Sequence, residues 1–71
     1  MSDHHTYKKV ELVGSSKTSI EDAINNALAE AAKSIKQMEW FEVVDTRGHV
    51  LNGAVAHYQV TLKVGFRIVN S

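Results

Sequence analysis

The dipeptide Asn52-Gly53, placed between two long β-rich runs, is the feature that most constrains the fold of this chain. Asn-Gly is a strong signal for a two-residue type I′ turn, because both central residues of that turn need a positive φ. The sequence therefore predicts a β-hairpin in which Leu51 faces Ala54. The run Trp40-Phe41-Glu42-Val43-Val44 belongs to its first arm, and residues 54–68 form the second.

The second arm alternates apolar and more polar residues, which is typical of a strand with one buried face. The odd-numbered side includes Gln59 and Arg67 and is expected to lie on the uncovered face. The even-numbered side must pack against a helix; it consists of Ala54, Ala56, Tyr58, Val60, Leu62, Val64, Phe66 and Ile68.

The first half of the chain predicts one strand and one helix. Residues 6–13 are β-rich and end at Gly14. Thr18-Ser19-Ile20-Glu21 matches a capping box, in which the Thr18 hydroxyl accepts from the Glu21 backbone N–H. Lys33 and Lys36 suit the negative end of a helix dipole. Apolar residues recur at helical spacing and include many alanines, which allow close packing: Ile20, Ala23, Ile24, Ala27, Leu28, Ala31, Ile35 and Met38.

The order of elements is therefore strand, helix, strand, strand. A helical crossover makes the first two strands parallel, and the hairpin makes the third antiparallel to both. The simplest arrangement is an α+β, βαββ fold whose three-stranded antiparallel sheet has the order 1-3-2, with one helix on one face. We expect a single domain over residues 1–71, with residues 1–5 as a flexible tail.

A regular hairpin places Trp40 opposite Gly65 and Phe41 opposite Val64. Phe41 and Val43 then join the core on the helix side. The indole of Trp40 lies on the uncovered face, where a glycine leaves room for the ring or for a molecule stacked on it.

The same register puts Gln59 opposite Thr46, about 20 Å from the tryptophan at about 3.4 Å per residue. A ligand that contacts both side chains then needs a neighbouring chain or strong local curvature. The register also puts Asp45 and Arg47 on the helix side, where charges are costly. We therefore expect a β-bulge around Thr46 to Gly48. The alternative is that this end of the hairpin projects beyond the helix.

A chain of 71 residues buries only about 60% of the surface that its unfolded form exposes. It has no cysteine, so disulfides cannot add stability, and association with further copies is the expected source of burial. His4 and His5 lie in the polar tail, and His49 and His57 are isolated in the sequence. We therefore expect no metal site.

The formal net charge is zero, with basic and acidic residues interspersed. Nucleic-acid-binding proteins usually carry a basic patch, so we expect no nucleic-acid partner. No apolar run approaches the roughly 20 residues of a membrane helix, and the first residues lack the apolar core of a signal peptide. We expect a cytoplasmic protein without a membrane partner.

The residue types alone suit a binding protein. Trp40 can stack on a flat ligand, and the Gln59 amide offers both a donor and an acceptor. The alternative is that Trp40 fills the core or an interface and that Gln59, Arg47 and Arg67 are ordinary surface residues. No pair of carboxylates, and no nucleophile beside a base, is arranged for catalysis.

The sequence resembles the dodecins, which are small flavin-binding proteins assembled from twelve identical subunits. The segments that carry the resemblance extend over nearly the whole chain: residues 10–16, the alanine-rich helix, Trp40-Phe41-Glu42-Val43, Arg47-Gly48 and residues 54–67.

The resemblance implies a set of binding residues. In dodecins two isoalloxazine rings stack at a two-fold axis between tryptophans of two subunits, and Trp40 fills that position. Gln59 matches a glutamine that hydrogen-bonds the flavin. Arg47 matches the bacterial members and favours FMN over unphosphorylated flavin, with riboflavin or FAD as the alternative cofactors. Arg67 matches a basic position near the ligand, and bacterial relatives also bind coenzyme A.

The implied function is storage and photoprotective sequestration of FMN in a hollow homododecamer without enzymatic activity. Two alternatives are a flavin-dependent redox enzyme and a non-catalytic structural or interaction module.

Overall fold

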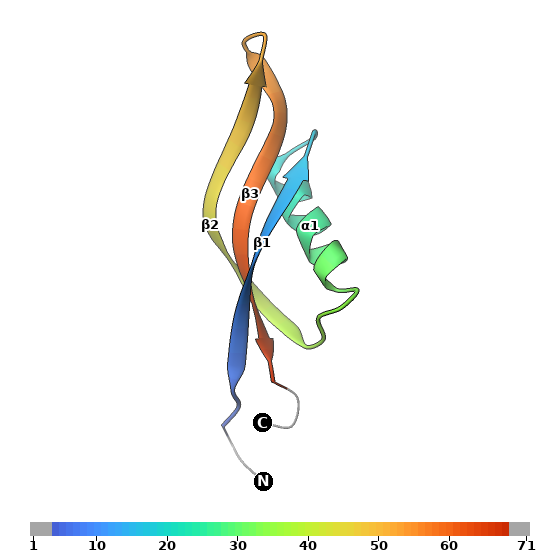
Figure 1. Cartoon of the computed structure of the whole chain (residues 1–71), viewed down its shortest axis with the longest axis vertical. Helices are drawn as coiled ribbons and strands as arrows, with labels where there is room; N and C mark the ends of the chain where they lie inside the picture. The colour runs from blue at the N-terminus through green and yellow to red at the C-terminus, as the bar shows by residue number, and fades with distance from the viewer. Residues whose placement is uncertain (1–3, 69–71) are drawn as a thin grey trace.

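The computed structural model describes residues 4–68. Its elements are β1 (Tyr7–Ser16), α1 (Ile20–Ala31), β2 (Met38–Leu51) and β3 (Ala54–Arg67). Strand β3 lies between β1 and β2 and is antiparallel to both (Figure 1). The predicted α+β, βαββ fold with order 1-3-2 is thus confirmed. Of the expected tail, residues 1–3 lie outside the described residues, and His4 and His5 are exposed ahead of β1.

The hairpin between β2 and β3 turns where the sequence predicts. Asn52 and Gly53 have φ angles of 54° and 77°, the positive values that a type I′ turn needs at both positions. Leu51 pairs with Ala54. The end of the hairpin projects beyond α1 (Figure 1), as the alternative in the sequence analysis anticipated.

The core lies between α1 and the middle of the sheet. Val60, Leu62 and Val64 of β3 are fully buried, which confirms over residues 60–64 that the even-numbered side of this strand faces the helix. Ala23 and Ala27 of α1 complete this buried cluster. Their small side chains let the helix approach the sheet closely, so that hydrophobic burial is concentrated in few residues.

The helix begins one residue later than the predicted capping box requires. The N-cap is Ser19, whose hydroxyl accepts a hydrogen bond from the Asp22 backbone N–H at 3.0 Å. The Ser16 hydroxyl accepts from the Thr18 backbone N–H at 2.9 Å and donates to the Asp22 carboxylate at 2.6 Å. The predicted pairing of Thr18 with Glu21 is therefore wrong, because the contacts of Ser16 and Ser19 hold the start of the helix instead.

The helix also ends earlier than the apolar spacing predicts. It stops at Ala31, and the Ser34 backbone N–H then bonds the Ala31 carbonyl at 3.0 Å, an i to i+3 bond that tightens the last turn. Gln37 adopts a left-handed conformation with φ 64° and turns the chain into β2. Lys33 and Lys36 therefore lie beyond the helix, and neither is in its last turn, where the sequence predicts that they complement the helix dipole.

The predicted register holds next to the turn and again from Val43 to Trp40, which lies opposite Gly65. Between these two stretches the register is shifted by one, because Ala56 of β3 and Val44 of β2 have no partner across the ladder. Beyond Trp40 it shifts once more, and Met38 rather than Glu39 pairs with Phe66. Arg47 rather than Thr46 therefore faces Gln59.

Over residues 38–67, the ladder has three irregularities. Two of them lie on either side of residues 46–48, around which one bulge was predicted, and none lies within that stretch. Together the two irregularities that flank residues 46–48 have the effect predicted for the bulge, which is to move the charged side chains off the helix side. Arg47 moves from the helix side to the open face, where its charge is solvated, and Asp45 moves with it.

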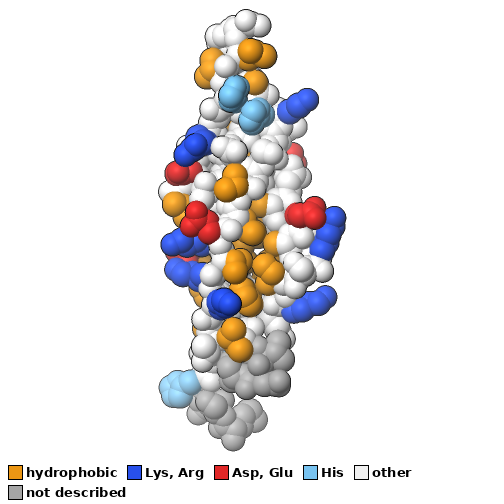
Figure 2. Space-filling view, in the orientation of Figure 1, with side chains coloured by type: hydrophobic (Ala, Val, Ile, Leu, Met, Phe, Trp, Pro, Cys, Tyr) orange, Lys and Arg blue, Asp and Glu red, His pale blue; other side chains and the backbone are white. Residues whose placement is uncertain are grey.

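Strand β2 is poorly covered by the helix, which packs on β1 and β3. Phe41 and Val43 each keep 45% of their surface exposed, so the expectation that they join the core is wrong. Hydrophobic side chains reach the surface in the middle of the molecule and near the hairpin turn (Figure 2). Within residues 4–68, no helix is long and apolar enough to cross a bilayer.

Candidate functional site

The indole of Trp40 lies on the open face of the sheet. Its cross-strand partner is Gly65, and a Cβ built on Gly65 would overlap the six-membered ring of the indole. The ring therefore lies directly over the backbone of β3, while 39% of the Trp40 surface stays exposed. The result is a flat aromatic surface supported from below by a strand.

Neighbouring side chains of β1 and β2 hold the indole in place. Its Nε1–H donates to a carboxylate oxygen of Glu42 at 3.0 Å, and the Lys9 ammonium donates to the same oxygen at 3.0 Å. The ring of Tyr7 contacts the indole edge-on, with centroids 5.5 Å apart and planes at 67°. Such edge-to-face pairs are favourable, so the orientation of the indole is fixed from two sides.

Glu42 is the electrostatic centre of this group. The hydrogen bond from Trp40, and next the one from Lys9, lower the pKa of Glu42 below its ordinary value of 4.5. Both donors favour the charged carboxylate, and a charged acceptor makes a stronger hydrogen bond with the indole. About half of each side chain of the Lys9–Glu42 pair is exposed, so the pair orients the ring more than it stabilises the fold.

Arg67 lies on the same face, two positions beyond Gly65 on β3 and opposite Tyr7. Its Nε atom is buried and has no hydrogen-bond partner among the described residues. A buried guanidinium N–H without a partner is unusual. Arg67 thus keeps an unused donor close to the aromatic pair, and it fits a ligand that carries oxygen acceptors.

Gln59 and Arg47 form a second group on this face, directly opposite one another on β3 and β2. Arg47 is exposed and lies 3.9 Å from the Asp45 carboxylate. Gln59 is six residues from Gly65 along β3, which corresponds to about 20 Å in an extended strand. Within one chain, the structure therefore brings Trp40 and Arg67 together and Arg47 and Gln59 together, but does not join the two groups.

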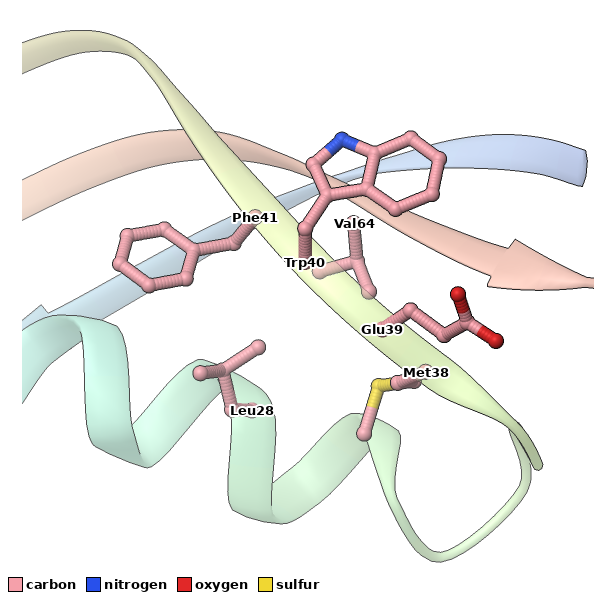
Figure 3. A pocket seen from close by; sticks show the side chains of 6 residues that line it. All are labelled: Leu28, Met38, Glu39, Trp40, Phe41 and Val64. Carbon is pink, nitrogen blue, oxygen red and sulfur yellow. The ribbon is translucent and has the colours of Figure 1, made fainter.

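A shallow groove of about 260 Å³ lies beside Trp40. Figure 3 shows that Leu28, Met38 and Phe41 line it on the helix side of β2, whereas the indole rises on the opposite side of the strand. Trp40 also lines the groove, so the groove borders this residue, although the indole ring points away from the helix. The groove is where β2 lacks helix cover, and its lining is mostly apolar.

The sequence reasoning missed Tyr7, Lys9 and Glu42. The spacing of Trp40 and Glu42 was an available signal, because residues two apart on a strand share a face. Tyr7 and Lys9 could not be placed from sequence, because a long helical connection rather than a turn sets the register of β1.

This fold and these residues match a known family. The dodecin family model matches residues 6–69. The chain belongs to the dodecin family. A dodecin from Thermus thermophilus is 52% identical over 62 residues, which cover 87% of this chain and 90% of that protein. The family is one of small binding proteins that associate with copies of themselves.

Solved dodecin structures share the fold. The dodecin of Streptomyces davaonensis superposes with a TM-score of 0.88 at 43% identity, over 94% of this chain and 97% of that one. The dodecin of Streptomyces coelicolor gives a TM-score of 0.91 at 41% identity, over 99% of this chain and all of that one. These similarities support the fold and the family.

Proposed function

We propose that this protein binds and stores FMN in a hollow homododecamer, with pairs of stacked flavins held between Trp40 side chains of two subunits. The observation that carries the proposal is the indole of Trp40, held over Gly65 with one side open. A rigid, exposed aromatic ring loses little conformational entropy when a flat ligand stacks on it. Membership of the dodecin family agrees with this ligand.

Two subunits are needed for one complete site. Gln59 and Arg47 lie about 20 Å from Trp40 along the strand, too far for one isoalloxazine ring to contact all three. We infer that a neighbouring subunit contributes the Gln59 amide, which offers a donor and an acceptor to the polar edge of the flavin. Association would also cover apolar side chains such as Phe41, Val43 and Val44, which are about half exposed.

The two arginines suit the oxygen atoms of FMN. The half-buried side chain of Arg67 has an unpaired Nε–H, which a small rotation would present to a flavin oxygen or a phosphate. The exposed guanidinium of Arg47 is suited to a phosphate, because a planar fork of N–H groups binds phosphate with two hydrogen bonds. Coenzyme A remains a second predicted ligand, without assigned residues, and a cytoplasmic location remains an expectation.

Bound flavin supplies a chromophore that is reactive when excited by light. The chain contributes an electron-rich indole in van der Waals contact, which can donate an electron to the excited ring and take it back. No net reaction results, so this function is storage and protection rather than turnover. A ring stacked between a second flavin and an indole has no open face for a substrate, which argues against a redox enzyme.

The test is titration of FMN into the apo-protein, followed by flavin fluorescence, for the wild type, Trp40→Ala and Trp40→Phe. We expect strong quenching by the wild type. Removing a stacked aromatic side chain costs about 1–3 kcal/mol per ring, so Trp40→Ala should bind about tenfold more weakly or worse. Trp40→Phe keeps a flat ring and should recover part of the affinity but little of the quenching.

Two controls make this result interpretable. Light scattering should give all variants a mass twelve times the 7.9 kDa of the chain; a monomer or dimer would contradict the assembly. Riboflavin, which lacks the phosphate, should bind more weakly than FMN to the wild type and equally with FMN to Arg47→Ala. Quenching that is unchanged in Trp40→Ala would refute the stacking.

A further inference from the structure

His49 and His57, which are separated along the sequence, lie face to face near the hairpin turn. They are direct partners in the β2–β3 ladder. Their imidazole rings are stacked, with centroids 5.2 Å apart and planes at 10°. Figure 2 shows two histidine side chains side by side at the surface toward the hairpin end.

The two histidines face each other because the register of this part of the ladder is shifted by one residue. The shifted part is bounded by the unpartnered residues Val44 and Ala56. In a regular hairpin His49 would face Ala56, and His57 would lie one position away. Because Ala56 has no partner in the ladder, His49 faces His57 instead. Directly opposed residues of an antiparallel pair have Cβ atoms only about 4.5–5.5 Å apart, which is close enough for both rings to contact one atom.

We propose that His49 and His57 form a chelating pair for a divalent first-row transition metal such as Cu²⁺, Ni²⁺ or Zn²⁺. Imidazole nitrogen is a preferred ligand for these ions. Zinc–nitrogen bonds of about 2.0–2.1 Å allow two coordinating nitrogens to be at most about 4.2 Å apart. A metal–nitrogen bond lies in the plane of the imidazole ring, so the stacked rings must rotate until one nitrogen of each points at the same ion within this limit.

Both side chains are free to make that movement. His49 is exposed and His57 is half-buried, and neither ring has a hydrogen bond to another described residue. Each ring therefore has a nitrogen available for a metal. Within residues 4–68 there is no cluster of three or more metal-ligating side chains, so the proposed site has two protein ligands and water in its other positions.

The neighbouring residues favour a transition metal over Ca²⁺ or Mg²⁺. On this face, the next row away from the turn holds Arg47 and Gln59, and the next row toward the turn holds Leu51 and Ala54. Neither row supplies a carboxylate, which the hard cations require. The Arg47 guanidinium lies 3.9 Å from a carboxylate oxygen of Asp45, which offsets its charge. Among divalent ions, imidazole sites bind Cu²⁺ most tightly, so copper is the most sensitive probe.

The experiment is a Cu²⁺ titration of the flavin-free protein, followed by electron paramagnetic resonance. His4→Ala/His5→Ala serves as the background for all variants, because the histidines of the tail can also bind copper. Loss of a group that merely supports a metal ligand costs about 10–100-fold in affinity. Removing either ligand itself, in His49→Ala or His57→Ala, should therefore weaken binding at least tenfold. The nitrogen hyperfine pattern should change from two nitrogens to one.

Thr61→Ala, on the same face of β3, is the matched control and should keep full affinity and the two-nitrogen spectrum. Circular dichroism should be unchanged in every variant, because none of the replaced side chains belongs to the buried core. Tight copper binding that persists when both histidines are replaced would overturn the proposal, as would single variants that lose nothing. No flavin is present, so this result is independent of the FMN titration.

Discussion

The indole of Trp40 occupies the space that a side chain at Gly65 would fill. Gly65 is not among the described residues with a positive φ, so a conformational need does not explain the glycine. Its role is steric, because the absence of a Cβ lets the ring lie over the strand. The flat surface that we propose as the flavin platform thus depends on two residues on different strands.

Gly65→Ala should displace the indole without unfolding the protein. The new Cβ would meet the ring of Trp40, which is at the surface and can rotate away. We expect FMN binding to weaken by about tenfold, which corresponds to about 1.4 kcal/mol, and tryptophan emission to change. Thr61→Ala on the same face is the control. A Gly65→Ala protein that quenches FMN like the wild type would show that the stacking geometry does not need this contact.

The orientation of Trp40 should depend on pH through Glu42. The hydrogen bonds from Trp40 and Lys9 lower the pKa of Glu42, so its charged form is favoured in the folded protein. A lowered pKa gives a contribution that is fully present above the ordinary value of 4.5 and is lost as the pH falls through the lower folded-state value. Because Trp40 is the only tryptophan, its emission, followed from neutral pH down into the acid range, measures this loss.

Glu42→Gln should remove this transition, because the amide can still accept from the indole but does not titrate. Glu11→Gln, on the same face of β1, is the control and should leave the transition in place. Circular dichroism over the same range separates it from acid unfolding. If Glu42→Gln keeps the wild-type emission profile, another group is responsible.

Gly14→Ala should destabilise the fold. A Cβ at Gly14 would overlap the Ala23 carbonyl and lie 2.8 Å from the Ala27 Cβ, so helix α1 would have to move away from β1. Overpacking of this kind costs about 1–3 kcal/mol. Urea denaturation should show that loss in the free energy of unfolding, with Lys17→Ala nearby close to neutral. A neutral Gly14→Ala would mean that α1 can shift freely on the sheet.

Features of the fold that depend on local chemistry could be predicted from the sequence. Asn52-Gly53 determines the turn, and the alternation of β3 determines its buried face, because both signals act within a few residues. The strand order follows from the connections. Trp40 is correctly placed opposite Gly65 because the two register shifts between that pair and the turn compensate each other. Each strand has one unpartnered residue in that stretch.

Cross-strand contacts that depend on the position of a single unpartnered residue could not be predicted from the sequence. In a regular hairpin, Asp45 and Arg47 would lie on the helix side of the sheet, where charges are costly. The sequence does not indicate which residues lose their cross-strand partners so that these two side chains reach the open face. The shifted stretch determines that Arg47 faces Gln59 and that the two histidines of the hairpin face each other. Sequence position alone therefore gives no sign that the two histidines are in contact. The early end of α1 has a similar cause, because the left-handed turn at Gln37 is set by the connection to β2 rather than by apolar spacing.

The start of α1 gives a direct test of the corrected cap. Ser19→Ala should remove the hydroxyl that accepts the Asp22 N–H, and loss of an N-cap costs about 0.5–2 kcal/mol. Thr18→Ala should cost much less, because the structure uses the Thr18 backbone N–H, which bonds Ser16, rather than its hydroxyl. Thermal unfolding of the two variants under the same conditions measures the difference. If Thr18→Ala is the more damaging substitution, the capping box that the sequence predicts is the one that the protein uses.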